Sequence, residues 1–214
     1  MICAGSPELL AKFVARQVDT FFPVEHDSGA VQAILDFIDP ALRRVRPIVD
    51  SVKSFESNKF NHLHSLQYTI FLYCLGREIY LTSPTSQLVD RLFCLNRSLN
   101  CIDLHPAVKM PDIFFISHGL SSVLGNAEYR GRIVIFQNVT VGRIGDRRPT
   151  LGCDVILYPG SSVTGRTNIG DNCVVSAGTP VHNLDIPNNS IVELVAGSIS
   201  IRPLKRDYIS LYFK

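Results

Sequence analysis

Histidines near the middle of the chain are the residues best suited to acid–base chemistry. The chain has six histidines, and two of them, His105 and His118, lie where a helix-like first half gives way to a repetitive second half. A neutral imidazole can take a proton from a hydroxyl group. The other four have no partner pattern, and we assign no chemistry to His26, His62, His64 or His182.

The cysteines do not suggest a metal site. The chain has six of them, with no CxxC pair and no Cys/His cluster at the spacing of zinc ligands. We therefore expect no metal, and we interpret the cysteines as reduced, mostly structural thiols of a cytoplasmic protein.

Aliphatic residues in the second half recur at a strict spacing of six. One run is Leu151, Leu157, Val163, Ile169, Val175 and Val181, and an upstream run in another phase is Val123, Tyr129, Ile135 and Val141. A period of six fits neither an α-helix nor a simple strand, and it is the hexapeptide pattern of a parallel β-helix. Ten residues separate Val141 from Leu151, which predicts that a loop interrupts the coils.

The expected fold class is α+β, with an N-terminal helical domain followed by the β-helix. We expect helices over residues 1–100, with breaks near Pro23 and residues 27–29, 54–59 and 83–86, hexapeptide coils over 101–201 and a tail over 202–214. The coils of a solenoid need caps at their ends, so the helical domain is expected to cap or assemble the β-helix.

Composition excludes several classes of protein. The formal net charge is only +2 and neither half carries a large charge, so we expect no nucleic-acid or anionic-membrane binding. The first 22 residues lack a basic segment followed by an apolar one, and their helical spacing predicts an amphipathic helix instead of a signal peptide. The densest apolar stretch, residues 68–76, is far too short to span a bilayer.

Motifs around the two histidines resemble those of serine acetyltransferases, over roughly residues 60–200. Residues 102–107, IDLHPA, resemble the family's DIHPxA segment, and His118 follows Asp103 by fifteen residues, in SHG, where the family has its catalytic Asp-His-Ala/Gly. Residues 137–142, QNVTVG, resemble QSVTLG, residues 145–149, GDRRP, resemble GDRHP, and residues 64–67, HSLQ, resemble HALQ.

The resemblance implies a left-handed β-helix and direct transfer of acetyl from acetyl-CoA to an acceptor hydroxyl, without a metal. His118 would be the general base, and Asp103 would orient its ring and stabilise the cation. A backbone N–H between Val141 and Leu151 would stabilise the oxyanion. His105 is expected to be structural.

The resemblance also places CoA in a groove between subunits of a homotrimer, and such trimers could pair into hexamers through the helical domain. Small residues let a thin pantetheine arm approach the backbone, and arginines suit the CoA phosphates. The expected CoA-binding residues are Thr140, Gly142, Arg143, Pro159, Gly160, Ala177, Gly178 and Arg202.

The expected acceptor site, Ser117, Arg147 and Arg148, departs from the family. Ser117 replaces an Asp that helps to bind the amino group of serine, and Arg147-Arg148 replaces an Arg-His that contacts the serine carboxylate. A third family contact, an Asp of the helical domain, has no secure counterpart, although Asp50 is near the place. Residues 197–202 lack the proline of the family's GVPAR segment.

These changes slightly favour a carbohydrate hydroxyl, as in polysaccharide modification, over the alternative, L-serine in cysteine biosynthesis, and two arginines would also suit an acidic acceptor. A serine enzyme should be inhibited by cysteine, whereas a sugar enzyme should not. A non-catalytic trimeric scaffold is a further alternative, against which the presence of Asp103 and His118 argues. The family's tail can dock into cysteine synthase through a final isoleucine, whereas this chain ends in ISLYFK, which argues against that partnership.

Overall fold

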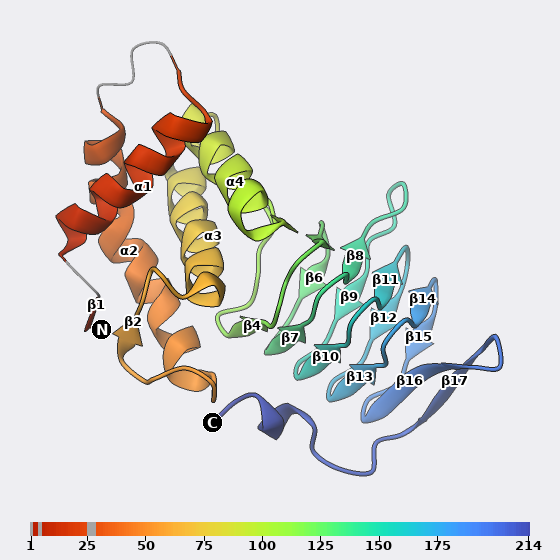
Figure 1. Ribbon diagram of the computed structural model, residues 1–214. Helices are drawn as coiled ribbons and strands as arrows, with labels where there is room; N and C mark the ends of the chain where they lie inside the picture. The colour runs from red at the N-terminus through yellow and green to blue at the C-terminus, as the bar shows by residue number, and fades with distance from the viewer. Residues whose placement is uncertain (1, 4–5, 25–28) are drawn as a thin grey trace. The chain divides into compact units, whose positions relative to one another are not determined.

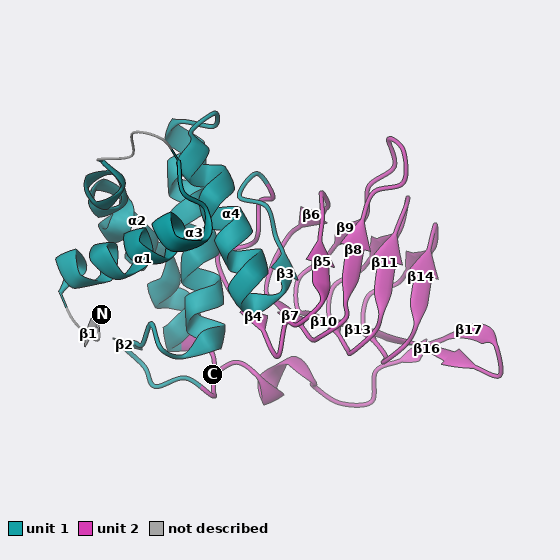
Figure 2. Ribbon diagram, turned by 45° about the horizontal axis from the view of Figure 1, so that its top comes forward, with its two compact units in different colours: residues 1–50, 55–107 teal, residues 51–54, 108–214 magenta. Residues whose placement is uncertain are grey.

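The computed structural model describes residues 2–3, 6–24 and 29–214. The chain divides into two compact units, residues 1–50 with 55–107 and residues 51–54 with 108–214 (Figure 2). The first unit holds the α-helices, and the second holds parallel strands wound into a β-helix and a short 3-10 helix, η1 (Ile209–Leu211), which confirms the predicted fold class. His26 and the helix break expected at residues 27–29, apart from Gly29, lie outside the described residues.

Helices build the first unit (Figure 1). They are α1 (Pro7–Phe21), α2 (Ala30–Ser51), α3 (Ser65–Thr82) and α4 (Gln87–Asn100), and the short strands β1 (Ile2–Cys3) and β2 (Lys59–Phe60) pair in parallel. The N-terminal segment forms the expected amphipathic helix α1. The Ser6 hydroxyl caps it by accepting the Leu9 N–H at 3.3 Å, and one face, which includes Leu10 and Val14, is buried.

α3 is buried on nearly all sides. The apolar stretch at residues 68–76 forms its middle, and the helix packs against α4. A helix that is apolar all round belongs in a protein core or a membrane, and its length decides between the two. Within the part of the chain that the structure describes, no helix has both the length and the apolar character that a membrane span requires.

The end of α4 carries the chain into the short strand β3 (Ile102–Asp103). Cys101 follows the last helical residue in the left-handed conformation, with φ 52°, and its N–H donates to the Arg97 carbonyl at 3.0 Å. This C-cap turns the backbone sharply out of the helix. Asp103 therefore lies only three residues beyond the helix end.

The segment after β3 is tied to α3. The buried Arg77 guanidinium donates to the carbonyls of Pro106 and Ala107 at 2.9 and 3.2 Å. A Cβ at Gly76 would lie 2.9 Å from the Pro106 ring, so only glycine allows this close packing. These contacts hold residues 101–107 within the helical unit, and the two units divide after residue 107.

The second unit is a parallel β-helix with three faces. The first face contains β4 (Phe114–Ile116), β7 (Ile133–Ile135), β10 (Val155–Leu157), β13 (Cys173–Val175) and β16 (Ser190–Val195), and β17 (Ser198–Pro203) pairs with β16 in antiparallel fashion. The second contains β5 (Ser122–Leu124), β8 (Thr140–Gly142), β11 (Ser162–Thr164) and β14 (Pro180–His182). The third contains β6 (Glu128–Tyr129), β9 (Thr150–Leu151), β12 (Asn168–Ile169) and β15 (Asp185–Ile186).

The register of these strands confirms the period of six. Aliphatic residues of the repeat are partners in neighbouring coils and are buried, as expected for side chains that point inward and stack. The stacks are Ile135, Leu157 and Val175 on the first face, Val141, Val163 and Val181 on the second, and Leu151, Ile169 and Ile186 on the third.

One member of the upstream run was predicted wrongly. Val123 is 42% exposed, and its neighbour Leu124 is the buried residue that aligns with Val141. Ile116 aligns with Ile135, so the chain takes eight residues from Ile116 to Leu124 but six between the equivalent residues of the next coil. The corner after β4 is therefore two residues longer than the repeat, and this shifts the phase.

The loop predicted between Val141 and Leu151 is present. Residues 143–149 leave β8 and return to β9, and a tight turn closes the loop through Ile144 N–H to Arg147 O at 2.8 Å and Arg147 N–H to Ile144 O at 3.1 Å. Gly145, with φ 58°, occupies the position that favours glycine.

The C-terminal segment, residues 204–214, runs back along the coils (Figure 1). Its Tyr212 ring contacts the rings of Phe115 and Phe136, with centroids 6.4 and 5.7 Å apart, and its hydroxyl bonds to the Tyr158 hydroxyl. Phe115 belongs to a row of buried residues on the outer side of the first face that also includes Val134, Ile156 and Val174. We call this segment the strap.

Candidate active site

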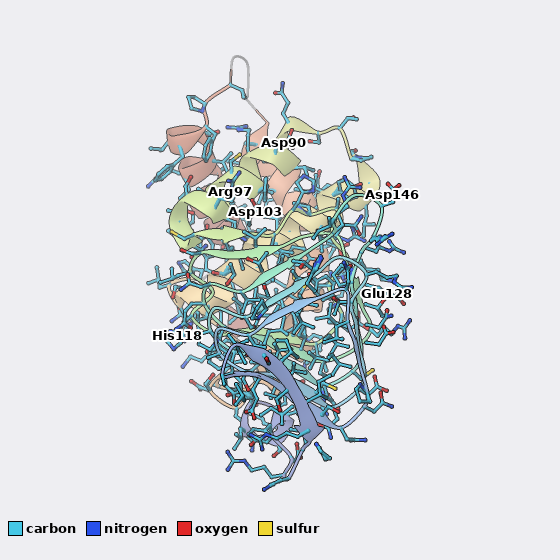
Figure 3. All side chains as sticks on the ribbon, turned by 90° about the vertical axis from the view of Figure 1, so that its right-hand side faces the viewer. Asp90, Arg97, Asp103, His118, Glu128 and Asp146 are labelled. Atoms are coloured by element: carbon cyan, nitrogen blue, oxygen red, sulfur yellow. The ribbon has the colours of Figure 1, made fainter. Side chains whose placement is uncertain are left out.

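His118 lies on the lengthened corner between β4 and β5, and its side chain is exposed (Figure 3). The flanking backbone is fixed by Ser117 N–H to Ile135 O at 2.7 Å and by Leu120 N–H to His118 O at 2.7 Å. A rigid corner that presents an exposed imidazole suits a general base, because the ring is held in place and a hydroxyl can reach it.

The conformation of His118 differs from the repeat. Each later coil turns at this edge through one left-handed residue three positions before the inward residue of the second face, namely Asn138, Gly160 and Gly178, and Ser121 takes that place in the first coil. His118, with φ 52°, is an additional left-handed residue inside the two-residue extension. Left-handed residues with side chains also occur at regular turns, such as Asn138 and Asp154, so it is the two-residue extension that distinguishes the corner of His118.

Ser117 is buried beside His118, with 7% of its surface exposed. Its small neutral side chain occupies the position where the sequence comparison expected a carboxylate. An Asp here would add a charge next to the imidazole, and this chain lacks it.

Asp103 lies in the helical unit, whereas His118 lies in the coiled unit. Within its own unit, the Asp103 Oδ2 atom is 3.5 Å from Arg97 Nε of α4, with the two side chains 38% and 55% exposed. The pairing of Asp103 with His118 stays a prediction. His105 accepts the Ala107 N–H at 3.0 Å through Nδ1, and its ring packs edge-on against Phe93 at 4.9 Å, which fits a structural role.

The loop at residues 143–149 presents the expected arginines Arg143, Arg147 and Arg148, all exposed. Glu128 at the start of the third face hydrogen-bonds to Arg130 at 3.0 Å. That bond and the Arg130 charge lower the pKa of Glu128, and the Arg148 charge adds to the effect. Arg148 therefore lies within electrostatic reach of a carboxylate that partly balances its charge.

Small residues expected to line the pantetheine arm gather on one corner of successive coils, the corner that carries His118 in the first coil. They are Pro159, Gly160, Ala177 and Gly178, with Gly160 N–H donating to Gln137 O and Gly178 N–H to Pro159 O. A Cβ at Gly178 would meet no atom within 4 Å, so the corner is open. Thr140 and Gly142 lie in β8 on the adjoining face, where Gly142 is likewise open.

Arg202 differs from the other expected CoA contacts. It lies in β17 and forms a bidentate ion pair with Glu193, with N–O distances of 2.6 and 2.8 Å. Hydrogen bonding to Arg202 lowers the pKa of Glu193. Because its guanidinium is already paired, Arg202 is a poorer phosphate ligand than the exposed Arg143.

Metal ligands do not gather in this structure. Across the described residues, no group of three His, Cys, Asp or Glu side chains could hold a metal ion. Cys74, Cys94, Cys101, Cys153 and Cys173 are free thiols.

Several known proteins similar to this chain are serine acetyltransferases. No family model matches the chain. The serine acetyltransferase of Synechococcus elongatus is 33% identical over 113 residues, 50% of this chain and 46% of the relative. That of Bacillus subtilis is 30% identical over 135 residues, 61% of this chain and 59% of the relative. The chain spans about half the length of these curated relatives.

Solved structures agree on the fold. Neisseria gonorrhoeae serine acetyltransferase has a TM-score of 0.68 at 21% identity, covering 97% of this chain and 84% of that one. Soybean serine acetyltransferase, solved in complex with serine, has a TM-score of 0.69 at 18% identity, covering 92% and 85%. In sequence the chain is similar to serine acetyltransferases over about half of its length, and its fold is that of the serine acetyltransferases of known structure.

The acceptor residues expected from the sequence differ from those of the serine acetyltransferases that the chain resembles. Ser117 lies on the lengthened corner and Arg148 on the 143–149 loop, and their part in binding an acceptor stays a prediction. The comparisons do not support the carbohydrate acceptor that these departures slightly favoured, and L-serine fits them better.

Sequence reasoning missed two residues near the candidate Asp103. Arg97 pairs with its carboxylate, and Arg77 anchors the segment that follows it. The position of Arg97 in the last turn of the helix could have indicated this pairing, because a cation there lies close to the residues that follow the helix. The sequence held no comparable signal for Arg77, because it lies 29 residues from the carbonyl that it binds.

Proposed function

We propose that this protein transfers the acetyl group of acetyl-CoA to the hydroxyl of L-serine. The observation that carries the proposal is the exposed His118 on a corner two residues longer than the repeat, above an open corner of small residues. Several relatives are named serine acetyltransferases, and two structural neighbours were solved with serine, which supports serine over a carbohydrate.

In the proposed reaction, His118 takes the proton of the acceptor hydroxyl as its oxygen attacks the thioester carbonyl. When the carbon–sulfur bond breaks, the protonated imidazole returns that proton to the departing thiolate. Asp103 would orient the ring and stabilise its cation. A backbone N–H of the 143–149 loop would stabilise the negative charge on the carbonyl oxygen.

The donor would lie along the corner of small residues. Pro159, Gly160, Ala177 and Gly178 would border the pantetheine arm, Thr140 and Gly142 would flank it, and Arg143 would meet a phosphate. The open space at Gly178 supports this placement, because a thin chain can approach the backbone there. We infer a homotrimer from the family resemblance, with the donor between subunits.

Arg147 would bind the carboxylate of serine, because a guanidinium suits a carboxylate bidentately. Ser117 is neutral, so recognition of the amino group would be weak. This departure is the specific feature that keeps a carbohydrate hydroxyl as the second candidate acceptor.

The test measures thiol release from acetyl-CoA with L-serine and with a panel of mono- and oligosaccharides. We expect turnover with L-serine, and a fall of about 10²- to 10⁴-fold in His118→Ala. His64→Ala, which removes an exposed histidine of the helical unit, is the matched control and should keep full rate. Release only with a saccharide would establish the second candidate, and no release above His118→Ala with any acceptor would favour a scaffold.

A further inference from the structure

Asp103 follows closely on the end of α4. α4 ends at Asn100, and the left-handed Cys101 turns the chain into β3, so the carboxylate comes three residues after the last helical turn. The C-terminus of a helix carries a partial negative charge of about half an elementary charge from its unpaired carbonyls. A cation in the last turn of a helix is favourably placed, and it can also pair with a carboxylate that follows the helix.

Arg97 supplies that cation from the last turn of the same helix. Its Nε atom is 3.5 Å from Asp103 Oδ2, and Figure 3 labels both residues. The guanidinium also lies over the Phe93 ring, 5.4 Å from its centroid, one helical turn earlier. This cation–π contact restricts the arginine, so the ion pair has one partner that is already oriented.

The backbone around Asp103 is fixed independently of Arg97. His105, two residues further along, packs on Phe93, and Arg77 holds the carbonyls of Pro106 and Ala107. The freedom that remains at Asp103 is that of its side chain. Contact with Arg97 engages one carboxylate oxygen, Oδ2, and restricts the rotation of that side chain.

We propose that Arg97 is a positioning residue that sets the carboxylate of Asp103 for its role toward His118. The inference rests on the proposed function, because it assigns Arg97 a part in the same reaction. Arg97 acts only through Asp103, so its loss lowers kcat and leaves the binding of both substrates unchanged.

The test compares Arg97→Met with Arg97→Lys. Methionine keeps an alkyl stem over Phe93 and removes the charge, whereas lysine keeps the charge without the planar fork. We expect kcat to fall about two- to fivefold in Arg97→Met, the range for a half-exposed ion pair. The KM values for serine and acetyl-CoA should stay within about twofold of wild type, and Arg97→Lys should recover part of the loss. Arg43→Ala, an exposed arginine of α2, is the matched control.

The same substitution in an Asp103→Asn background separates positioning from general structure. If Arg97 acts through the carboxylate, Arg97→Met lowers kcat no further once Asp103→Asn is present. An equal fall in both backgrounds, or a wild-type kcat in Arg97→Met, overturns the inference while wild-type turnover with serine leaves the proposed function intact. A wild type without turnover overturns both.

Discussion

Replacement of Phe213 by alanine should release the strap from the coils. Phe213 is 2% exposed, it forms an isolated β-bridge with Val52, and the Arg132 guanidinium lies 5.6 Å from its ring centroid. The bridge is extended by Lys53 N–H to Tyr212 O, at 2.8 Å. The strap backbone therefore joins residues 51–54, and the buried Phe213 ring packs beside Arg132, which precedes β7.

The expected cost follows from this burial. Truncation of a fully buried phenylalanine costs about 3 to 5 kcal/mol of unfolding free energy, and the cation–π contact with Arg132 contributes about 0.5 to 1 kcal/mol of it. For a chain of this length each kcal/mol lowers the melting temperature by about 2 to 4 °C, so Phe213→Ala should lower it by roughly 6 to 20 °C.

The assay is thermal denaturation followed by circular dichroism, with Leu211→Ala as the matched control. Leu211 is an apolar residue of the same strap but is 54% exposed, so its truncation should change the melting temperature by less than about 2 °C. Equal melting temperatures for the two variants would refute the packing of the strap. Aggregation of Phe213→Ala on heating would fit exposure of the apolar row Phe115, Val134, Ile156 and Val174.

Two further perturbations test packing and burial. Gly152→Ala would place a Cβ 2.4 Å from Asp171 Oδ1 and 2.7 Å from the Gly170 carbonyl carbon. We therefore expect the free energy of unfolding, measured by urea denaturation, to fall by about 1 to 3 kcal/mol. Gly142→Ala is the control, because its Cβ would meet open space and should leave the stability nearly unchanged. Equal stability of these two variants would contradict the close approach of the coils. Burial raises the pKa of the Cys74 thiol from 9.0 to about 12. Its stabilising contribution is therefore complete below pH 9 and is lost as pH rises toward 12, by about 1.4 kcal/mol per pH unit. Urea denaturation from pH 8 to 10.5 should show a steeper decline for wild type than for Cys74→Ala, and parallel declines would contradict the burial.

The coils were predictable because their physics is local and repeated. Each hexapeptide buries one side chain against its equivalents in the next coil, so a period of six read from single residues gives the strand register, and the extra four residues before Leu151 give the loop. Val123 was predicted wrongly because it lies six residues before Tyr129, and this spacing alone does not show whether Val123 or its neighbour Leu124 points inward. Only the pairing of Leu124 with Val141 shows which residue points inward.

Contacts between distant segments could not be predicted. The strap binds residues 51–54 of the same unit about 160 positions earlier, and no periodicity records such a contact. The pairing of Arg202 with Glu193 depends on a hairpin turn at residues 196–197 that the hexapeptide pattern does not contain. A free arginine and a paired one look identical in sequence, so Arg202 was expected at the CoA phosphates.

Departures from the repeat mark the candidate site more sharply than the repeat itself. The corner that holds His118 has two extra residues, and the loop that holds Arg143, Arg147 and Arg148 has four; both interrupt coils that are otherwise regular. A third departure is a coil that is one residue short. Equivalent residues such as Val155 and Cys173 are 18 positions apart, whereas Ile169 pairs with Ile186 only 17 positions later. In this coil the Asn188 side chain accepts the Asp171 N–H at 2.8 Å. The shortened coil and the two lengthened segments differ in what their side chains do. The shortened coil uses its side chains to satisfy the backbone, whereas the lengthened corner and loop satisfy their own backbone and leave an imidazole and three guanidinium groups exposed. We therefore take exposed side chains on a segment longer than the repeat, with its own backbone hydrogen-bonded, as the physical signature of the site.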